Sequence, residues 1–191
     1  MEKMIYALAF TSALAISLFL TPIIIKLAYK FKCLAQPNQL RWHKDATALL
    51  GGIGIYIAFI TALFLFVEID KAILGLIAGS SVIFLIGLID DILHIKPQLK
   101  LIGQIIASCI VLAFGISFEI IPVKWLVLPL TIFWIVGIAN AFNLLDNMDG
   151  LSCGIAFISC GFLFIYSLLN QMHSVALLSV IAAGASLGFL R

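Results

Sequence analysis

The fold is decided by residues 72–89, which read AILGLIAGSSVIFLIGLI and contain no charged side chain. As an α-helix this run would rise about 27 Å, close to the thickness of the hydrocarbon core of a bilayer. It ends at two adjacent carboxylates, Asp90 and Asp91. The run therefore predicts a membrane-spanning helix with acidic residues at one end.

The rest of the chain has the same character. Of its 191 residues, 64% are hydrophobic and 10% are charged, whereas about 25% of residues in an ordinary soluble domain are charged. The four cysteines show no paired spacing and are interpreted as small apolar side chains. We predict an integral membrane protein, and expect the membrane but no nucleic acid among its partners.

The apolar pattern repeats along the chain and predicts an all-α polytopic bundle of about seven transmembrane helices, in one domain over residues 1–191. The first run exceeds the 7 to 15 apolar residues of a signal peptide and is interpreted as a spanning helix, with Pro22 as a candidate kink. Glycines four apart, such as Gly75/Gly79 and Gly184/Gly188, predict close helix packing. The expected runs are 4–29, 53–67, 72–89, 99–118, 125–142, 151–169 and 175–190.

Basic residues predict the orientation. If loops alternate between the two sides, one side has three, namely Lys3, Lys71 and Lys124. The other side has Lys26, Lys30, Lys32, Arg41, Lys44, Lys96, Lys100 and Arg191. The positive-inside rule then places the amino terminus outside and the carboxyl end in the cytoplasm. We therefore expect a multi-pass membrane protein whose acidic clusters lie at the cytoplasmic face.

Acidic residues lie only at the ends of apolar runs, which discriminates between classes of membrane protein. Transporters and ion pumps commonly carry ionisable groups near the bilayer midplane. A site at headgroup depth instead suits a reaction between a water-soluble donor and a lipid headgroup. A small transporter remains the less favoured alternative.

Polar side chains recur at steps of three in the stretch 140–150, which reads NAFNLLDNMDG. On a helix Asn140/Asn143, Asn143/Asp146 and Asp146/Asp149 each share a face, although the whole series drifts around the helix. Each pair is therefore a candidate to converge on one ligand.

The pair Asp90-Asp91 forms a second acidic cluster. Adjacent carboxylates repel one another unless a cation lies near them, and Mg²⁺ favours a few carboxylates together with substrate phosphates. Lys96 and Lys100, one helical turn apart, are candidates to face a phosphate. The alternative is that the carboxylates only end a helix and the lysines only follow the positive-inside rule.

These motifs together resemble the polyprenyl-phosphate N-acetylhexosamine-1-phosphate transferases, a glycosyltransferase 4 type family. The resemblance covers residues 87–91, 100–104 and 140–151, and a first loop with Pro37-Asn38, His43 and Gly51-Gly52. It implies transfer of a hexosamine 1-phosphate from a UDP-N-acetylhexosamine to undecaprenyl phosphate, with release of UMP. It is closest to the undecaprenyl-phosphate N-acetylglucosaminyl 1-phosphate transferases.

The resemblance also implies roles for residues. Asp90 and Asp91 match the catalytic acidic pair, and Mg²⁺ or Mn²⁺ would be held by Asp91, Asp146 and Asp149. Whether a carboxylate first forms a covalent phospho-intermediate stays open, as does a homodimer. Substrate binding is expected at Asn143, Asp146, Asp149, Lys100 and His43.

Departures from the family pattern refine these expectations. The stretch 47–52 reads TALLGG, where the muramoyl-pentapeptide members resemble Thr-Pro-Thr-Met-Gly-Gly, so we favour N-acetylglucosamine as the sugar. The product would begin a cell-surface polysaccharide, such as an O antigen, a common antigen or a wall polymer. Members usually have ten or eleven helices, so we expect the amino-terminal portion of a longer transferase or, alternatively, an inactive fragment of one.

Overall fold

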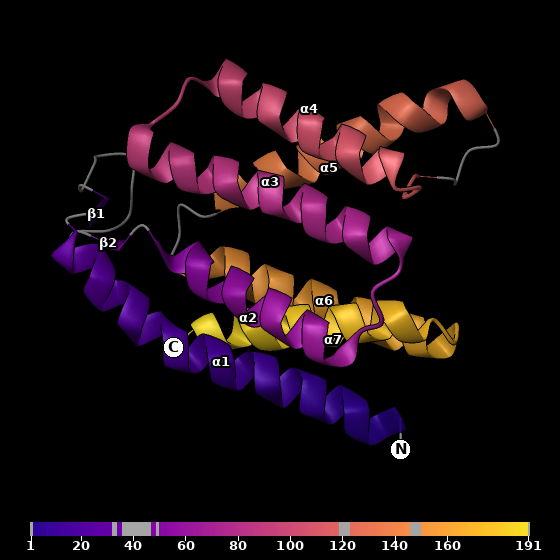
Figure 1. Ribbon diagram of the computed structural model, residues 1–191, viewed down its shortest axis with the longest axis horizontal. Helices are drawn as coiled ribbons and strands as arrows, with labels where there is room; N and C mark the ends of the chain where they lie inside the picture. The colour runs from indigo at the N-terminus through magenta and orange to yellow at the C-terminus, as the bar shows by residue number, and fades with distance from the viewer. Residues whose placement is uncertain are drawn as a thin grey trace. The chain divides into compact units, whose positions relative to one another are not determined.

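The computed structural model describes residues 2–31, 34–35, 47–48, 50–118, 123–145 and 150–190. Apolar helices account for nearly all of these residues (Figure 1). The elements are α1 (Glu2–Lys30), β1 (Leu34–Ala35), β2 (Thr47–Ala48), α2 (Gly51–Phe66), α3 (Lys71–Leu93), α4 (Pro97–Ala113), α5 (Lys124–Leu145), α6 (Leu151–Leu169) and α7 (His173–Phe189).

Seven α-helices in the described ranges confirm the polytopic membrane helix bundle. Four are long and apolar enough to cross a bilayer, namely α1, α3, α5 and α6. The helices α2, α4 and α7 are apolar but shorter, with 16, 17 and 17 residues. The run expected at 99–118 is interrupted because α4 ends at Ala113 and Gly115 has a positive φ of 91°.

Two short strands form the only β-sheet among the described residues. β1 and β2 pair antiparallel, with Leu34 opposite Ala48 and Ala35 opposite Thr47. The ladder joins the two ends of the polar segment between α1 and α2. His43 lies in that segment, outside the described residues.

Local sequence explains where α3 begins and ends and where α4 begins. Asp70 caps the start of α3, because its carboxylate accepts a hydrogen bond of 2.7 Å from the backbone N–H of Ile73. His94 ends α3 in a left-handed conformation with φ 50°. Pro97 then opens α4, where its missing N–H costs no helical hydrogen bond, and holds Lys96 extended.

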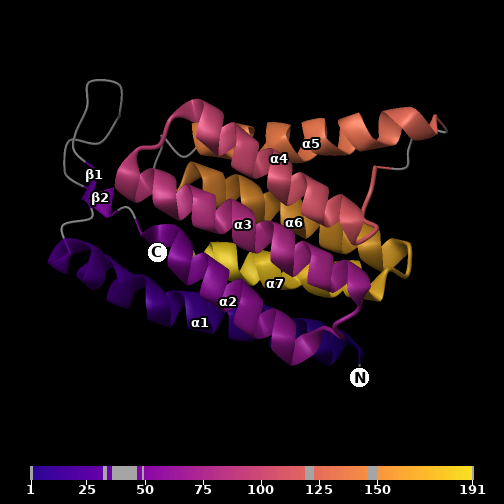
Figure 2. The same cartoon turned by 45° about the horizontal axis from the view of Figure 1, so that its top comes forward.

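The helices form two compact units, residues 1–68 with 145–191, and residues 69–144. In the first unit α7 packs against α1, α2 and α6, and α1 also packs against α2. Figures 1 and 2 show α1, α6 and α7 running side by side. This unit brings together α1 and α7, the first and last helices among the described residues.

Small residues make the contact between α1 and α7 close. A Cβ at Gly184 would meet the backbone carbonyl oxygen of Phe10, and one at Gly188 would lie 2.7 Å from that of Leu14. The buried hydroxyl of Ser17 donates to the carbonyl of Ala185 at 2.8 Å. The sequence prediction of close packing at these glycines is confirmed.

In the second unit α3 packs against α4, and side-chain hydrogen bonds link α4 to α5. A Cβ at Gly79 would meet the side chain of Val111 in α4, so the prediction for this glycine is also confirmed. Phe118, which follows α4, donates its backbone N–H to Thr131 Oγ1 in α5 at 3.0 Å. Asp90, Lys100 and Asn143 consequently lie at the same end of this unit.

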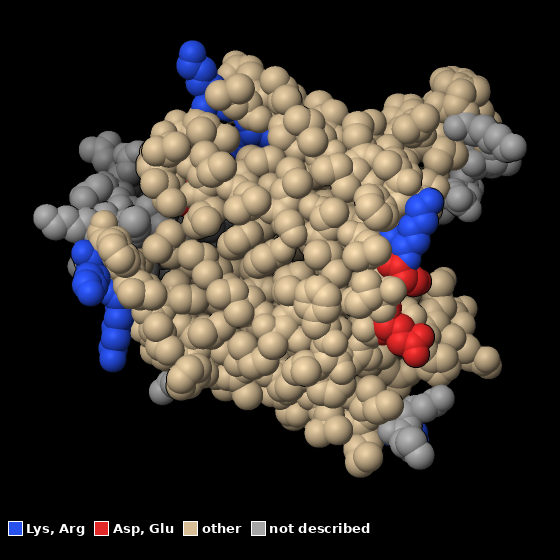
Figure 3. Space-filling model, viewed as in Figure 1, with Lys and Arg blue, Asp and Glu red and all other residues tan. Residues whose placement is uncertain are grey.

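The surface of both units is apolar. Large side chains such as Phe133, 74% exposed, and Phe162, 71% exposed, project outward from α5 and α6. Figure 3 shows a face on which uncharged residues predominate and charged residues lie at the margins. Such a surface would be unfavourable in water but suits contact with lipid.

We predict that Gly184→Ala lowers stability because the added methyl group cannot avoid a backbone atom. The loss should be about 1 to 3 kcal/mol, the usual cost of overpacking. Gly137 in α5 is the matched control, since a Cβ there meets nothing within 4 Å. Gly137→Ala should be neutral or slightly stabilising. Thermal unfolding in detergent measures both, and equal effects would contradict the close α1–α7 contact.

Candidate active site

The candidate site is built on three helices of the second unit, where α3 ends, α4 begins and α5 ends. Asp90 and Asp91 lie in the last turn of α3. Carboxylates are unfavourable there, because the carbonyl end of a helix carries partial negative charge. A cation nearby would offset this cost.

Lys100 supplies that cation. Its ammonium group contacts the Asp90 carboxylate at 2.7 Å, and the two side chains are 16% and 25% exposed. It also donates to the amide oxygen of Asn143 at 2.8 Å. One side chain from α4 therefore joins α3 to α5.

A second polar pair lies one turn after Lys100 in α4 and one turn before Asn143 in α5. Asn140 donates to Gln104 Oε1 at 2.8 Å, and Gln104 donates in return to Asn140 Oδ1 at 3.5 Å. Gln104 is 3% exposed, and Asn140 also donates to the carbonyl of Val136 at 2.9 Å. Burial makes an unpaired amide costly, so this pair fixes how α4 and α5 lie against each other.

The structure brings together some of the residues expected from sequence. Asn140 and Asn143 share a face of α5, as their spacing predicts, and both contact α4. Lys100 and Asp90 are paired directly, whereas Lys96 precedes α4 and is exposed. Asp91 is half-buried beside Asp90. Three expected residues, His43, Asp146 and Asp149, lie outside the described residues.

Gln104 is the residue to which sequence analysis assigned no role. Its signal was a lone amide within an apolar run, four residues after Lys100 and hence on the same helix face. A polar side chain buried in such a run is kept only where it has a partner.

The donor set can be compared with the expected metal. Among the described residues no three His, Cys, Asp or Glu side chains group together to hold an ion. Lys100 is paired with Asp90. The side chain of Asp91 is of the carboxylate type that Mg²⁺ prefers as a ligand. The described part thus fits Mg²⁺ through Asp91, with any further carboxylates coming from residues beyond it.

Comparisons with known proteins agree on one family. The model of glycosyl transferase family 4 matches residues 73–191. A probable undecaprenyl-phosphate N-acetylglucosaminyl 1-phosphate transferase from Bacillus subtilis is 27% identical over 99% of this chain and 56% of its own length.

Two further relatives are named for different substrates. A decaprenyl-phosphate N-acetylglucosaminephosphotransferase from Mycobacterium leprae is 31% identical over 96% of this chain and 53% of its own length. A phospho-N-acetylmuramoyl-pentapeptide-transferase from Thermoanaerobacter sp. is 29% identical over 100% of this chain and 67% of its own length. The chain spans about half the length of the first two relatives.

We predict that Gln104→Leu destabilises the protein by about 0.5 to 2 kcal/mol, because it leaves the Asn140 amide without its partner. The double variant Gln104→Leu/Asn140→Leu should lose less than the sum of the two single variants. Gln98→Leu is the control, since Gln98 is exposed on the same helix. Additive losses in a double-mutant cycle of thermal unfolding would show that the pair is not coupled.

Proposed function

Because this chain belongs to glycosyl transferase family 4, we propose that it works in the transfer of N-acetylglucosamine 1-phosphate to undecaprenyl phosphate. An oxygen of the lipid phosphate attacks the phosphorus that bears the sugar in UDP-N-acetylglucosamine. The bond from that phosphorus to UMP breaks, and UMP leaves with the electron pair. The product begins a cell-surface polysaccharide.

The observation that carries this proposal is the bridge from Lys100 to Asp90 and Asn143. It gathers a cation, a carboxylate and an amide at one end of an apolar helix unit, with Asp91 adjacent. A lipid phosphate reaches the same depth, because its headgroup lies where spanning helices end. Polar chemistry and a lipid-linked acceptor can therefore meet there.

The proposed roles follow from these contacts. Lys100 is placed to draw the negatively charged phosphates toward α4 while it neutralises Asp90. Asn143 holds the ammonium from the other side, so that its position is fixed before substrate arrives. Asp90 in turn orients Lys100, and Asp91 is assigned to the metal or to the lipid phosphate on the family motif and on its carboxylate chemistry.

Mg²⁺ or Mn²⁺, when bound, would screen the repulsion between the lipid phosphate and the donor pyrophosphate. We assign it to Asp91, Asp146 and Asp149, on the family motif and on the oxygen chemistry of these side chains. His43 is assigned to phosphate binding on the motif alone. The donor nucleotide is assigned to Asn143, Asp146 and Asp149.

Two features support the remaining parts of the proposal. The stretch 47–52 departs from the muramoyl-pentapeptide pattern, which favours N-acetylglucosamine as the sugar. The candidate spans and the bacterial sources of the relatives make this a multi-pass bacterial membrane protein. The distribution of basic residues favours an active site at the cytoplasmic face of the inner membrane.

We predict that Asp91→Asn and Lys100→Met each lower transfer by about 100-fold or more, the scale expected when a charge that stabilises the transition state is lost. Label from radioactive UDP-N-acetylglucosamine is counted in the lipid extract of membranes. Glu68→Gln, at an exposed position after α2, is the control and should keep full activity. Wild-type rates in either site variant would exclude the site.

The assay is run on the product of the intact gene, including any sequence after codon 191, and in parallel on the 191-residue chain. If the protein from the intact gene transfers the sugar phosphate and the 191-residue chain does not, the chain contains only part of the active site. No transfer by either, with normal membrane insertion, would favour the inactive alternative.

Metal dependence gives a separate prediction. EDTA should abolish transfer, and Mg²⁺ or Mn²⁺ should restore it, because the phosphates otherwise repel one another. Asp91→Asn should raise the Mg²⁺ concentration needed for half-maximal transfer. Lys100→Met should lower the rate without raising this concentration as much. Full activity in EDTA would contradict the proposed metal site.

A further inference from the structure

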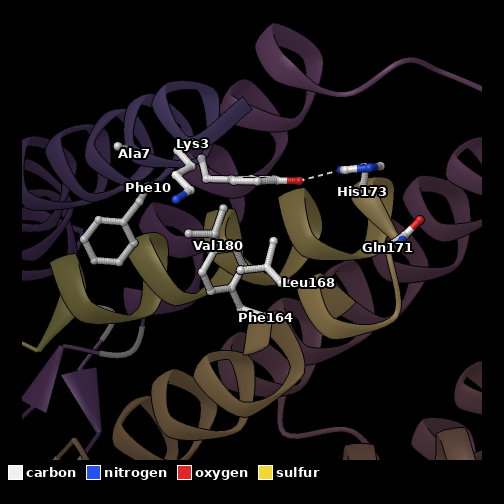
Figure 4. Close-up of a pocket in the computed structure, with 9 residues that line it drawn as sticks. Lys3, Ala7, Phe10, Phe164, Leu168, Gln171, His173 and Val180 are labelled. Atoms are coloured by element: carbon white, nitrogen blue, oxygen red, sulfur yellow. Dashed lines mark hydrogen bonds between the residues drawn. The ribbon is translucent and has the colours of Figure 1, made fainter. Parts of the chain in front are cut away.

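A pocket of about 790 Å³ lies within the first unit, between α1, α6 and α7. It lies where α1 begins and where the chain turns from α6 into α7. Figure 4 shows the Tyr6–His173 hydrogen bond on one side of the pocket and the side chains of Phe164, Leu168 and Val180 on the other. No role in the proposed transfer uses these residues.

The polar lining of the pocket consists of hydrogen-bond donors. Lys3, Gln171 and His173 are exposed at the helix ends, and none of the described residues that line the pocket is acidic. Tyr6, 8% exposed, lies 2.8 Å from His173 Nδ1. When its hydroxyl donates to Nδ1, the proton of the neutral imidazole is on Nε2, which becomes a donor as well.

Packing holds this arrangement in place. The rings of Tyr6 and Phe164 meet edge to face, with centroids 5.4 Å apart and planes at 74°. The pocket thus has a fixed aromatic wall beneath its donors. An anion bound by these hydrogen-bond donors would also form an ion pair with Lys3. Among the described residues that line the pocket, Lys3 supplies the positive charge.

The deeper lining is apolar. From Lys3 to Phe10 along α1, and from His173 to Val180 along α7, the pocket extends about 10 Å along each helix. Its lining therefore changes from cationic to apolar over the distance that separates a lipid phosphate from the first carbons of its acyl chains. A phospholipid has this distribution of polarity.

A phospholipid in this pocket would be distinct from undecaprenyl phosphate, the acceptor of the proposed reaction. The pocket lies at the end of α6 near Leu169, whereas the polar motif 140–150 leads into the opposite end at Leu151. A helix of 19 residues separates these ends by about 27 Å, nearly the thickness of the hydrocarbon core.

We propose that the pocket binds an anionic phospholipid from the leaflet in which α1 begins and α6 ends. Its phosphate accepts hydrogen bonds from Lys3, His173 Nε2 and Gln171, and part of one acyl chain packs against Phe10 and Phe164. A zwitterionic lipid binds less well, because its own cation repels the Lys3 ammonium.

Titration with phosphatidylglycerol, followed by native mass spectrometry of the detergent-purified chain, tests this site. Ala7 lines the pocket from an exposed position, so Ala7→Phe fills it without disturbing the core. We expect Ala7→Phe to weaken binding by about tenfold and Lys3→Gln by about fivefold. Lys71→Gln, an exposed lysine at the start of α3, is the control and should bind as the wild type does.

Phosphatidylcholine is titrated under the same conditions, and thermal unfolding is measured for every variant. Weaker binding of phosphatidylcholine to the wild type, and equal binding of both lipids to Lys3→Gln, would support the site. Equal binding of both lipids to the wild type would overturn it, as would unchanged phosphatidylglycerol binding in folded Ala7→Phe.

Discussion

In a hydrocarbon solvent every polar group of the chain needs a partner within the protein, and this constraint shapes both units. Helices satisfy the backbone, and small hydroxyl side chains bond back to their own helix, as Thr21 does to the carbonyl of Ser17 at 2.7 Å. Ser108 and Thr131 do the same at 2.8 and 2.7 Å. Larger polar side chains must find partners on other helices, which is why Gln104 and Asn140 face each other.

The same constraint separates two kinds of polar contact in the second unit. The Gln104–Asn140 pair is neutral and buried, and it holds helices together. The Lys100 bridge is charged, lies nearer the helix ends and remains partly exposed. A charged pair at that depth can exchange a protein partner for a ligand at a smaller cost than one at the midplane. The arrangement therefore combines a rigid neutral contact with a charged group that is open to substrate.

Hydropathy was sufficient to predict the helices, because runs without charge have few alternatives in a bilayer. Spacing was sufficient to place Asn140 and Asn143 on one face, since this depends only on helix geometry. The end of α4 at Ala113 was missed, because Ile116 to Phe118 continue the apolar pattern after the turn at Gly115. The partner of Asn140 was also missed, since pairing between helices depends on tertiary packing. Asp146 and Asp149 stay predictions from the motif.

The contact of α1 with α7 has a consequence for how the protein is made. Ser17 and Ala185 are 168 positions apart, so the ribosome adds 168 residues between the synthesis of one and of the other. At roughly 5 to 20 residues per second, the first helix waits about 10 to 30 s in the bilayer before its main partner emerges. During that time its buried stripe of alanine and serine faces lipid or other proteins. Membrane chaperones or neighbouring helices that recognise small-residue surfaces have this interval in which to act.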